Sequence, residues 1–255
     1  MTGRGALIVS ALALALGWGL PGGAANAADP DVLWKIVSDK CVPDETASGK
    51  PAPCRLVDLD GRYAALKDLA GVAQYLLIPT DKITGIESPD LEKQGTPNYF
   101  EDAWQSRRFM AESLGRAVPR GEVGLAINSE KGRTQNQLHI HIDCMRADVL
   151  AALAANEATV GPTWSILPVK LAGHSYLAMR IEAPDLSEAN PFRLLANGVP
   201  AAAADMGDQT LVVVGTTFSD GRQGFYLLAD HVDLAAGDRG SGEELLDHAC
   251  ALLAQ

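Results

Sequence analysis

A strict alternation of apolar and polar residues between Gln137 and Cys144 constrains the fold more than any other feature of the chain. The run reads Gln-Leu-His-Ile-His-Ile-Asp-Cys. Successive side chains of a β-strand point to opposite faces, so the alternation predicts a strand with one apolar and one polar face. His139 and His141 would share the polar face with Gln137 and Asp143, their backbones about 7 Å apart. Two imidazoles at this spacing can reach one phosphate group.

The turn before this strand, residues 132–136, adds groups that bind anions. It reads Gly-Arg-Thr-Gln-Asn and supplies the guanidinium of Arg133, the hydroxyl of Thr134, two side-chain amides and backbone N–H groups. Donors of this kind bind phosphate oxygens. The turn and the strand together favour chemistry on a phosphate.

Two other interpretations of the paired histidines stay open on the pattern alone. Paired imidazoles on a strand can belong to an ordinary exposed surface. His-x-His on a strand is also a common pair of zinc ligands, with His174, His231 or His248 as a third ligand.

Hydrophobic periodicity in the surrounding chain predicts an α+β fold. Apolar residues recur at helical spacing over residues 31–40 and 96–114. Short runs typical of strands cover residues 55–60, 63–67, 74–79 and 123–128. We expect an antiparallel sheet with helices packed on one face.

The second half of the chain repeats the order of these segments without the histidines. A strand-like run over 174–181, a helical pattern over 190–206 and strand-like runs over 210–217 and 225–230 follow one another. Tyr226 and Leu228 stand where the first half has its histidines. We therefore expect a catalytic half at 28–148 and a duplicated half at 149–255 that has kept the packing and lost the chemistry. It would end in a linker over 235–243 and a terminal helix over 243–253.

The first 27 residues are typical of an export signal. One Arg precedes an apolar run over residues 5–20, and Ala25-Asn26-Ala27 offers small residues for cleavage. A retained anchor is the alternative, since the uncharged stretch over 5–28 is about as long as a membrane span, although Pro and Gly interrupt it. We expect a bacterial protein exported to the periplasm or anchored in the inner membrane.

Four cysteines follow this segment, and an oxidising compartment permits disulfides among them. Cys41 and Cys54 flank a polar, Pro-rich segment that we expect to be a loop. A bridge between them would restrict the unfolded chain by about 3 kcal/mol, and we predict this pair. For Cys144 and Cys250 two readings remain, a second disulfide or a small buried hydrophobe at Cys144.

The charge of the chain excludes one class of partner. The formal net charge is −11 at pH 7. Neutralising a nucleic-acid backbone needs clustered Lys and Arg, and the sequence contains no such run. We expect no nucleic-acid partner.

Several blocks along the chain resemble the CDP-diacylglycerol pyrophosphatase family of the histidine-triad superfamily. They are LWKIVSDKCVP, KPAPC, ALKDLAGVAQYLLIPTDKITGIESPDL and EVGLAINSEKGRTQNQLHIHI, in the family's order. The resemblance implies a HIT-like antiparallel sheet. It also implies hydrolysis of CDP-diacylglycerol to CMP and phosphatidate at a membrane surface, and our preferred interpretation involves no metal and no other cofactor.

The resemblance also implies roles for individual residues. The superfamily motif is His, apolar, His, apolar, His, and its middle His attacks the α-phosphorus. On this sequence the middle position is His139 and the third is His141, whereas Gln137 replaces the first His and can still donate or accept a hydrogen bond. The further substrate-binding candidates are Asn128, Thr134, Arg133 and Asp68.

Two rival functions belong to other classes. A zinc-dependent exported phosphoesterase would use the histidines as ligands and would lose activity in a chelator. A non-catalytic nucleotide-lipid binding protein is the third possibility, and Gln137 in place of a histidine is the feature that favours it.

Overall fold

The computed structural model describes residues 1–2 and 29–254 of the chain. Apart from Met1 and Thr2, the expected signal or anchor over residues 1–27 lies outside the described residues. Among the described helices, none combines the length and the apolar composition that a bilayer crossing requires.

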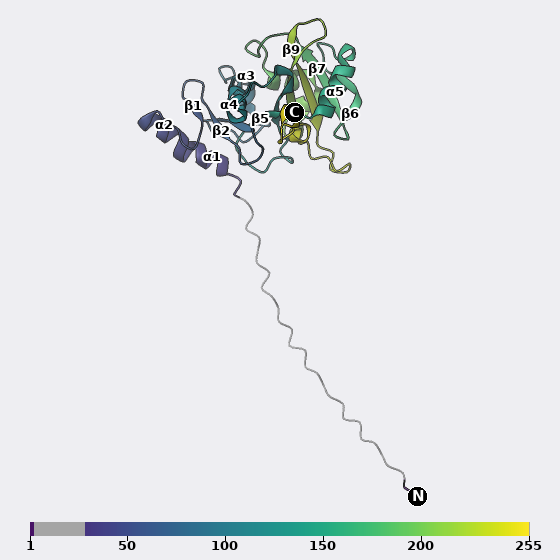
Figure 1. Cartoon of the computed structure of the whole chain (residues 1–255), viewed down its shortest axis with the longest axis horizontal. Helices are drawn as coiled ribbons and strands as arrows, with labels where there is room; N and C mark the ends of the chain where they lie inside the picture. Colours follow the sequence, from purple (N-terminus) through teal and green to yellow (C-terminus); the bar gives the residue numbers. More distant parts are fainter. Residues whose placement is uncertain (3–28, 255) are drawn as a thin grey trace.

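One antiparallel sheet of nine strands forms the centre of the protein (Figure 1). Its spatial order is β1-β2-β3-β5-β4-β8-β9-β7-β6. The strands are β1 (Leu56–Asp58), β2 (Tyr63–Lys67), β3 (Tyr75–Pro79), β4 (Val123–Ile127), β5 (Ile140–Cys144), β6 (Ser165–Leu171), β7 (His174–Ile181), β8 (Gln209–Thr217) and β9 (Gln223–His231). The predicted antiparallel α+β class is confirmed.

The two halves of the sheet have the same strand order. The first half reads β2-β3-β5-β4, and the second half, read inward from its own edge, is β6-β7-β9-β8. The halves join where β4 pairs with β8, with Ala126 opposite Val212. In each half a hairpin is followed by two helices and then by a second hairpin.

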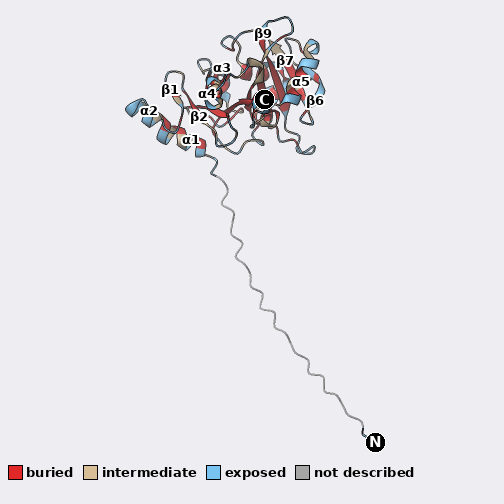
Figure 2. Cartoon of the chain, viewed as in Figure 1, coloured by how far each residue is buried: buried red, intermediate tan, exposed pale blue. Residues whose placement is uncertain are grey.

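Helices cover both faces of the sheet, so the expectation of helices on one face is wrong. The helices are α1 (Val32–Ile36), α2 (Val42–Ser48), α3 (Tyr99–Ser106), α4 (Arg108–Leu114), α5 (Ala147–Ala155), α6 (Pro191–Gly198) and α7 (Pro200–Ala204). Helices α3, α4, α6 and α7 pack into one large core on one face of the sheet. On the other face α1 packs into a smaller cluster that includes Leu76, and α5 packs into another that includes Ala126. The cause is the composition of the central strands, because β3, β4 and β5 are buried along their whole length. Figure 2 shows buried residues in the interior of the fold and exposed residues on the outer helices.

The segment between Cys41 and Cys54 is largely helical, which corrects the expected loop. A π-helical turn over Val37–Cys41 joins α1 to α2. Gly49 ends the helix at a positive φ of 66°. The predicted disulfide from Cys41 to Cys54 is present. It ties this exposed helix to the start of β1.

The helix predicted over residues 243–253 is replaced by two short 3-10 turns, η5 (Gly242–Leu245) and η6 (Ala251–Ala254). Between them Leu246 forms a β-bridge with Met145, and Cys250 has a positive φ of 49°. A continuous helix cannot include either conformation. Cys250 forms the second disulfide with Cys144, which settles the pairing that the sequence left open.

Candidate active site

His139 and His141 lie on one face of the sheet, at the boundary between its two smaller apolar clusters. His141 is opposite Leu76 of β3 and opposite Ala126 of β4. Leu76 belongs to the cluster under α1, and Ala126 belongs to the cluster under α5. The apolar residues of the alternation point to the other face, into the large core: Leu138, Ile140, Ile142 and Cys144. The division of this segment into two faces therefore agrees with the prediction.

The imidazole of His139 is held in one tautomer by the backbone. Its Nδ1 lies 2.7 Å from the carbonyl oxygen of Gln137. A carbonyl can only accept, so Nδ1 carries the proton and Nε2 keeps its lone pair. No group in residues 29–254 forms a hydrogen bond with this Nε2, and the residue retains 8% exposure. His139 thus presents an unprotonated ring nitrogen.

His141 is held in the opposite tautomer by Gln74 and Asp68. Its Nδ1 lies 2.8 Å from Nε2 of Gln74, and the same Nε2 lies 2.8 Å from Oδ2 of Asp68. Because a carboxylate accepts, Asp68 orients the Gln74 amide with its NH2 group toward both neighbours. Nδ1 of His141 is then an acceptor, and the proton of this ring is on Nε2.

The two rings therefore offer complementary groups side by side. Their centroids are 4.9 Å apart and their planes meet at 71°. One presents a lone pair and the other presents an N–H, which is the pair of groups needed to attack phosphorus and to donate to an oxygen bound to it.

Burial keeps both rings uncharged. Removal from water lowers the pKa of His139 to about 4, and the neighbouring His141 adds to this effect. Burial likewise lowers the pKa of His141 to about 4. Both imidazoles are neutral at pH 7, so each has a lone pair on one nitrogen and a proton on the other.

Asn128 and Glu243 complete the arrangement beside His141. Asn128 follows β4, and its Nδ2 donates to Oε1 of Glu243 over 2.7 Å. Its Oδ1 accepts from the hydroxyl of Ser241 at 3.2 Å. The same Oε1 of Glu243 lies 3.2 Å from Nε2 of His141, but the angle is not that of a hydrogen bond. The Nε2–H of His141 therefore forms no hydrogen bond with any residue in the described part of the chain.

The guanidinium of Arg133, a predicted substrate-binding group, is buried in an ion pair with Glu87. Its guanidinium makes a bidentate contact with Glu87, over 2.6 and 2.7 Å. A Cβ at Gly85 would lie 2.3 Å from Nη1 of Arg133, so only glycine allows this approach. Arg133, Gly85, Asn128 and His139 line one narrow hollow.

The remaining substrate-binding candidates, Gln137, Thr134 and Asp68, lie in three different environments. Gln137 is fully buried, and its amide donates to the carbonyls of Pro79 and Asp81. It fixes the entry to β5. Thr134 is exposed on the loop before β5, and no contact within the described ranges ties it to His139. Asp68 acts on the site through Gln74.

The zinc interpretation requires a third ligand close to both histidines. In the described part of the chain, two sets of three ligand atoms lie within 4.8 Å of one another, and neither set includes His139 or His141. His174 contacts Glu244, and His248 contacts Asp143.

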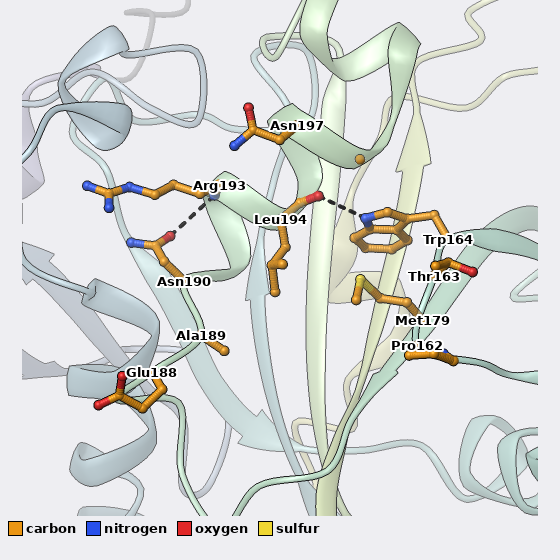
Figure 3. A pocket seen from close by; sticks show the side chains of 11 residues that line it. Pro162, Thr163, Trp164, Met179, Glu188, Ala189, Asn190, Arg193, Leu194 and Asn197 are labelled. Atoms are coloured by element: carbon orange, nitrogen blue, oxygen red, sulfur yellow. Dashed lines mark hydrogen bonds between the residues drawn. The ribbon is translucent and has the colours of Figure 1, made fainter.

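A larger cavity, about 590 Å³, lies elsewhere (Figure 3). It is lined by α6 and by the chain around Trp164, whose indole N–H donates to the carbonyl of Leu194. Met179 supplies a further apolar surface. None of its lining residues belongs to the histidine site.

Two disulfides indicate an extracytoplasmic α+β protein, and paired neutral imidazoles suit hydrolysis at phosphorus. The family model of CDP-diacylglycerol pyrophosphatase matches residues 28–254. A CDP-diacylglycerol pyrophosphatase of Yersinia pestis is 47% identical over 223 residues, which are 88% of this chain and 85% of the relative. The chain belongs to the CDP-diacylglycerol pyrophosphatase family, as the sequence blocks predicted.

Proposed function

We propose that this protein hydrolyses CDP-diacylglycerol to CMP and phosphatidate through a cytidylyl group carried on His139. One observation carries the proposal: His139 and His141 are adjacent, neutral and of opposite tautomer. Family membership supplies the substrate. Neither imidazole needs a metal or another cofactor for this role.

The first step forms a bond from Nε2 of His139 to the cytidylyl phosphorus. The bond from that phosphorus to the bridging oxygen breaks, and phosphatidate leaves with the electron pair. His141 Nε2–H donates to an oxygen of the pyrophosphate as negative charge develops there. Water then attacks the cytidylyl phosphorus, the N–P bond breaks, and CMP leaves. The products are those of one hydrolysis.

The position of the attack can be tested with oxygen-18 water. Attack by His139 on the cytidylyl phosphorus requires the solvent oxygen to enter CMP. Full-length protein would be incubated with CDP-diacylglycerol in labelled water, with and without a chelator, and both products analysed by mass spectrometry. We expect label in CMP in both conditions. Label in phosphatidate would exclude this attack, and loss of turnover in the chelator would favour a metal enzyme.

The pH profile should show the lowered pKa of His139. Protonation of Nε2 removes the attacking lone pair, so kcat/KM falls as pH drops through the pKa of this ring. We expect the acidic limb near pH 4, instead of near 6.5 where an exposed histidine titrates. The measurement is CMP release against pH over a range in which the protein stays folded. A limb near 6.5 would mean that the ring is solvated during turnover.

Gln74→Glu should reverse the tautomer of His141. A carboxylate beside Nδ1 accepts a hydrogen bond from it, so Nδ1 holds the ring proton and Nε2 loses the N–H that donates to the pyrophosphate. We expect kcat to fall by about 100-fold with little change in KM. Gln105→Glu, on the exposed side of α3, is the matched control. An unchanged kcat in Gln74→Glu would show that this N–H does not take part.

We infer a HIT-like architecture made of two related halves, 28–148 and 149–255. The common strand order and the helix pairs α3–α4 and α6–α7, which pack into the same core, support this inference. In the second half Tyr226 and Leu228 lie among apolar residues in the cluster under α5. These two side chains therefore pack in an apolar cluster at the positions where the first half has its histidines.

We propose that the protein acts outside the bacterial inner membrane, with residues 1–27 as a signal or an anchor. The two disulfides support an oxidising compartment. Leu69 and Val72 support contact with lipid, because both are exposed on the loop between Asp68 and Gln74. This loop is adjacent to the histidine site, so lipid bound there would bring the headgroup close to the site.

Replacing Leu69 and Val72 with serine tests this contact. Each substitution removes apolar side-chain area that would be buried in lipid. The KM for CDP-diacylglycerol in vesicles should therefore rise by about tenfold or more. Hydrolysis of a water-soluble CDP ester should not change. Leu234→Ser, at an exposed residue away from this loop, is the control. An equal change with both substrates would point to a folding defect and not to lipid contact.

A further inference from the structure

We propose that His174, Asp230, Asp238 and Glu244 form a binding site for a divalent transition-metal cation. The site lies in the second half of the chain, apart from His139 and His141. It does not depend on the proposed reaction.

These side chains converge from β7, from β9 and from the chain that follows β9. His174 begins β7 and Asp230 lies near the end of the adjacent β9, while Asp238 and Glu244 follow on the loop and on η5. Ligand atoms of His174, Asp230 and Glu244 all lie within 4.8 Å of one another. Nδ1 of His174 is 2.9 Å from Oε1 of Glu244 and 3.4 Å from Oδ2 of Asp238. Ligands bound about 2 Å from one ion are about 3 Å apart, so small adjustments suffice.

A buried oxygen without a partner points into this cluster. Asp230 is 6% exposed, and its Oδ1 accepts the backbone N–H of His231 over 2.7 Å. Its Oδ2 is buried, and no residue in 29–254 donates to it. A carboxylate oxygen buried without a donor is unfavourable, and a cation would supply the missing partner.

The charge of the cluster also favours a cation. Within the described ranges, the ion pairs of the three carboxylates involve only the imidazoles of His174 and His231, and no Lys or Arg side chain. The hydroxyl of Tyr176 donates to Oε1 of Glu244 over 2.7 Å and orients it.

The donors indicate which cations fit. Three carboxylates with one imidazole and no thiolate suit Mn²⁺ or Zn²⁺ better than Ca²⁺ or Mg²⁺, which take oxygen ligands. Glu244 is adjacent in sequence to Glu243, which accepts from Asn128. A bound cation would therefore fix η5 and hold Glu243 in place beside His141.

Titration of the purified full chain with Mn²⁺, followed by the electron paramagnetic resonance signal of the free ion, tests the site. We expect one Mn²⁺ bound per chain and displaced by Zn²⁺. His174→Gln and Asp230→Asn should each weaken binding by about tenfold or more, since each removes one ligand. Asp60→Asn, at an exposed carboxylate in the first half of the chain, should bind as wild type does.

Thermal unfolding separates loss of the site from loss of the fold. Asp230→Asn should raise the melting temperature of the metal-free protein, because an amide replaces a poorly paired buried carboxylate, and Mn²⁺ should no longer raise it. Wild-type protein that binds no Mn²⁺ at millimolar concentration would overturn the proposal. So would a folded Asp230→Asn or His174→Gln protein that binds Mn²⁺ as tightly as wild type.

Discussion

His139→Gln is expected to lower kcat/KM for CDP-diacylglycerol by about 10⁴-fold or more. The amide has no nitrogen lone pair able to attack phosphorus, so the two-step route through a covalent intermediate is lost. Removing an attacking residue usually leaves only the rate that binding and oxyanion stabilisation provide. The measurement is CMP release by purified full-length protein under conditions where the rate is proportional to enzyme.

Two controls separate this loss from a folding defect. His231→Gln replaces an exposed imidazole in the second half and should keep wild-type activity. The melting temperature of His139→Gln should stay close to that of wild type, because glutamine is similar in size and the ring accepts no hydrogen bond at Nε2 from the described residues. A well-folded His139→Gln protein with activity within about tenfold of wild type would contradict nucleophilic attack by this residue.

Replacing Cys144 and Cys250 together with alanine should lower the free energy of unfolding by about 4–5 kcal/mol. The bridge joins residues 106 apart, so it removes a large part of the freedom of the unfolded chain. The matched pair is Cys41 and Cys54, which are only 13 residues apart. Its loss should cost about 3 kcal/mol on the same entropy model. Urea unfolding of the two double variants measures both values.

The two disulfides should also differ in their effect on activity. Cys250 ties the C-terminal segment to β5, and that segment carries Glu243 and His248. His248 donates to the buried carboxylate of Asp143 over 2.7 Å. Loss of this bridge should therefore lower kcat/KM even where the protein is still folded, whereas loss of the bridge at α2 should not. Equal activity losses, or a smaller stability loss for the longer loop, would contradict this assignment.

The alternation over residues 137–144 was enough to predict which side chains share a face, because the strand period of two is a local property of the chain. The Cys41 to Cys54 bridge was also accessible, since its two ends are close in sequence. Strands β1 and β2 lie within the strand-like runs over 55–60 and 63–67, because short apolar runs are also a local signal.

Other parts of the site depend on contacts that no local pattern carries. Gln74 and Glu243 lie 67 and 102 residues from His141 in sequence, and each stands at the start of a run that was assigned as a strand or a helix. They meet His141 only because β3 pairs with β5 and because the second disulfide holds the C-terminal segment. The tautomers depend on these partners and could not be inferred from His-x-His.

The two segments whose helical structure was wrongly predicted, 42–53 and 243–253, also depend on distant contacts. The polar composition between Cys41 and Cys54 suggested a loop, yet α2 is an exposed helix held by a disulfide. The apolar run over 243–253 has helical periodicity, but the tertiary bonds of Leu246 and Cys250 override it. β6 and α5 were missed, and α5 is the helix that covers the second half on the histidine face.

The most direct test of attack by His139 on phosphorus is to trap the covalent intermediate in a single turnover. Full-length protein in excess over CDP-diacylglycerol would be quenched in alkali, which preserves a bond from phosphorus to histidine, and its peptides analysed by mass spectrometry. The prediction is a cytidylyl group on His139 that appears and decays during the turnover and is absent in His139→Gln. A phosphatidyl group on the protein, or a cytidylyl group on a different residue, would contradict it.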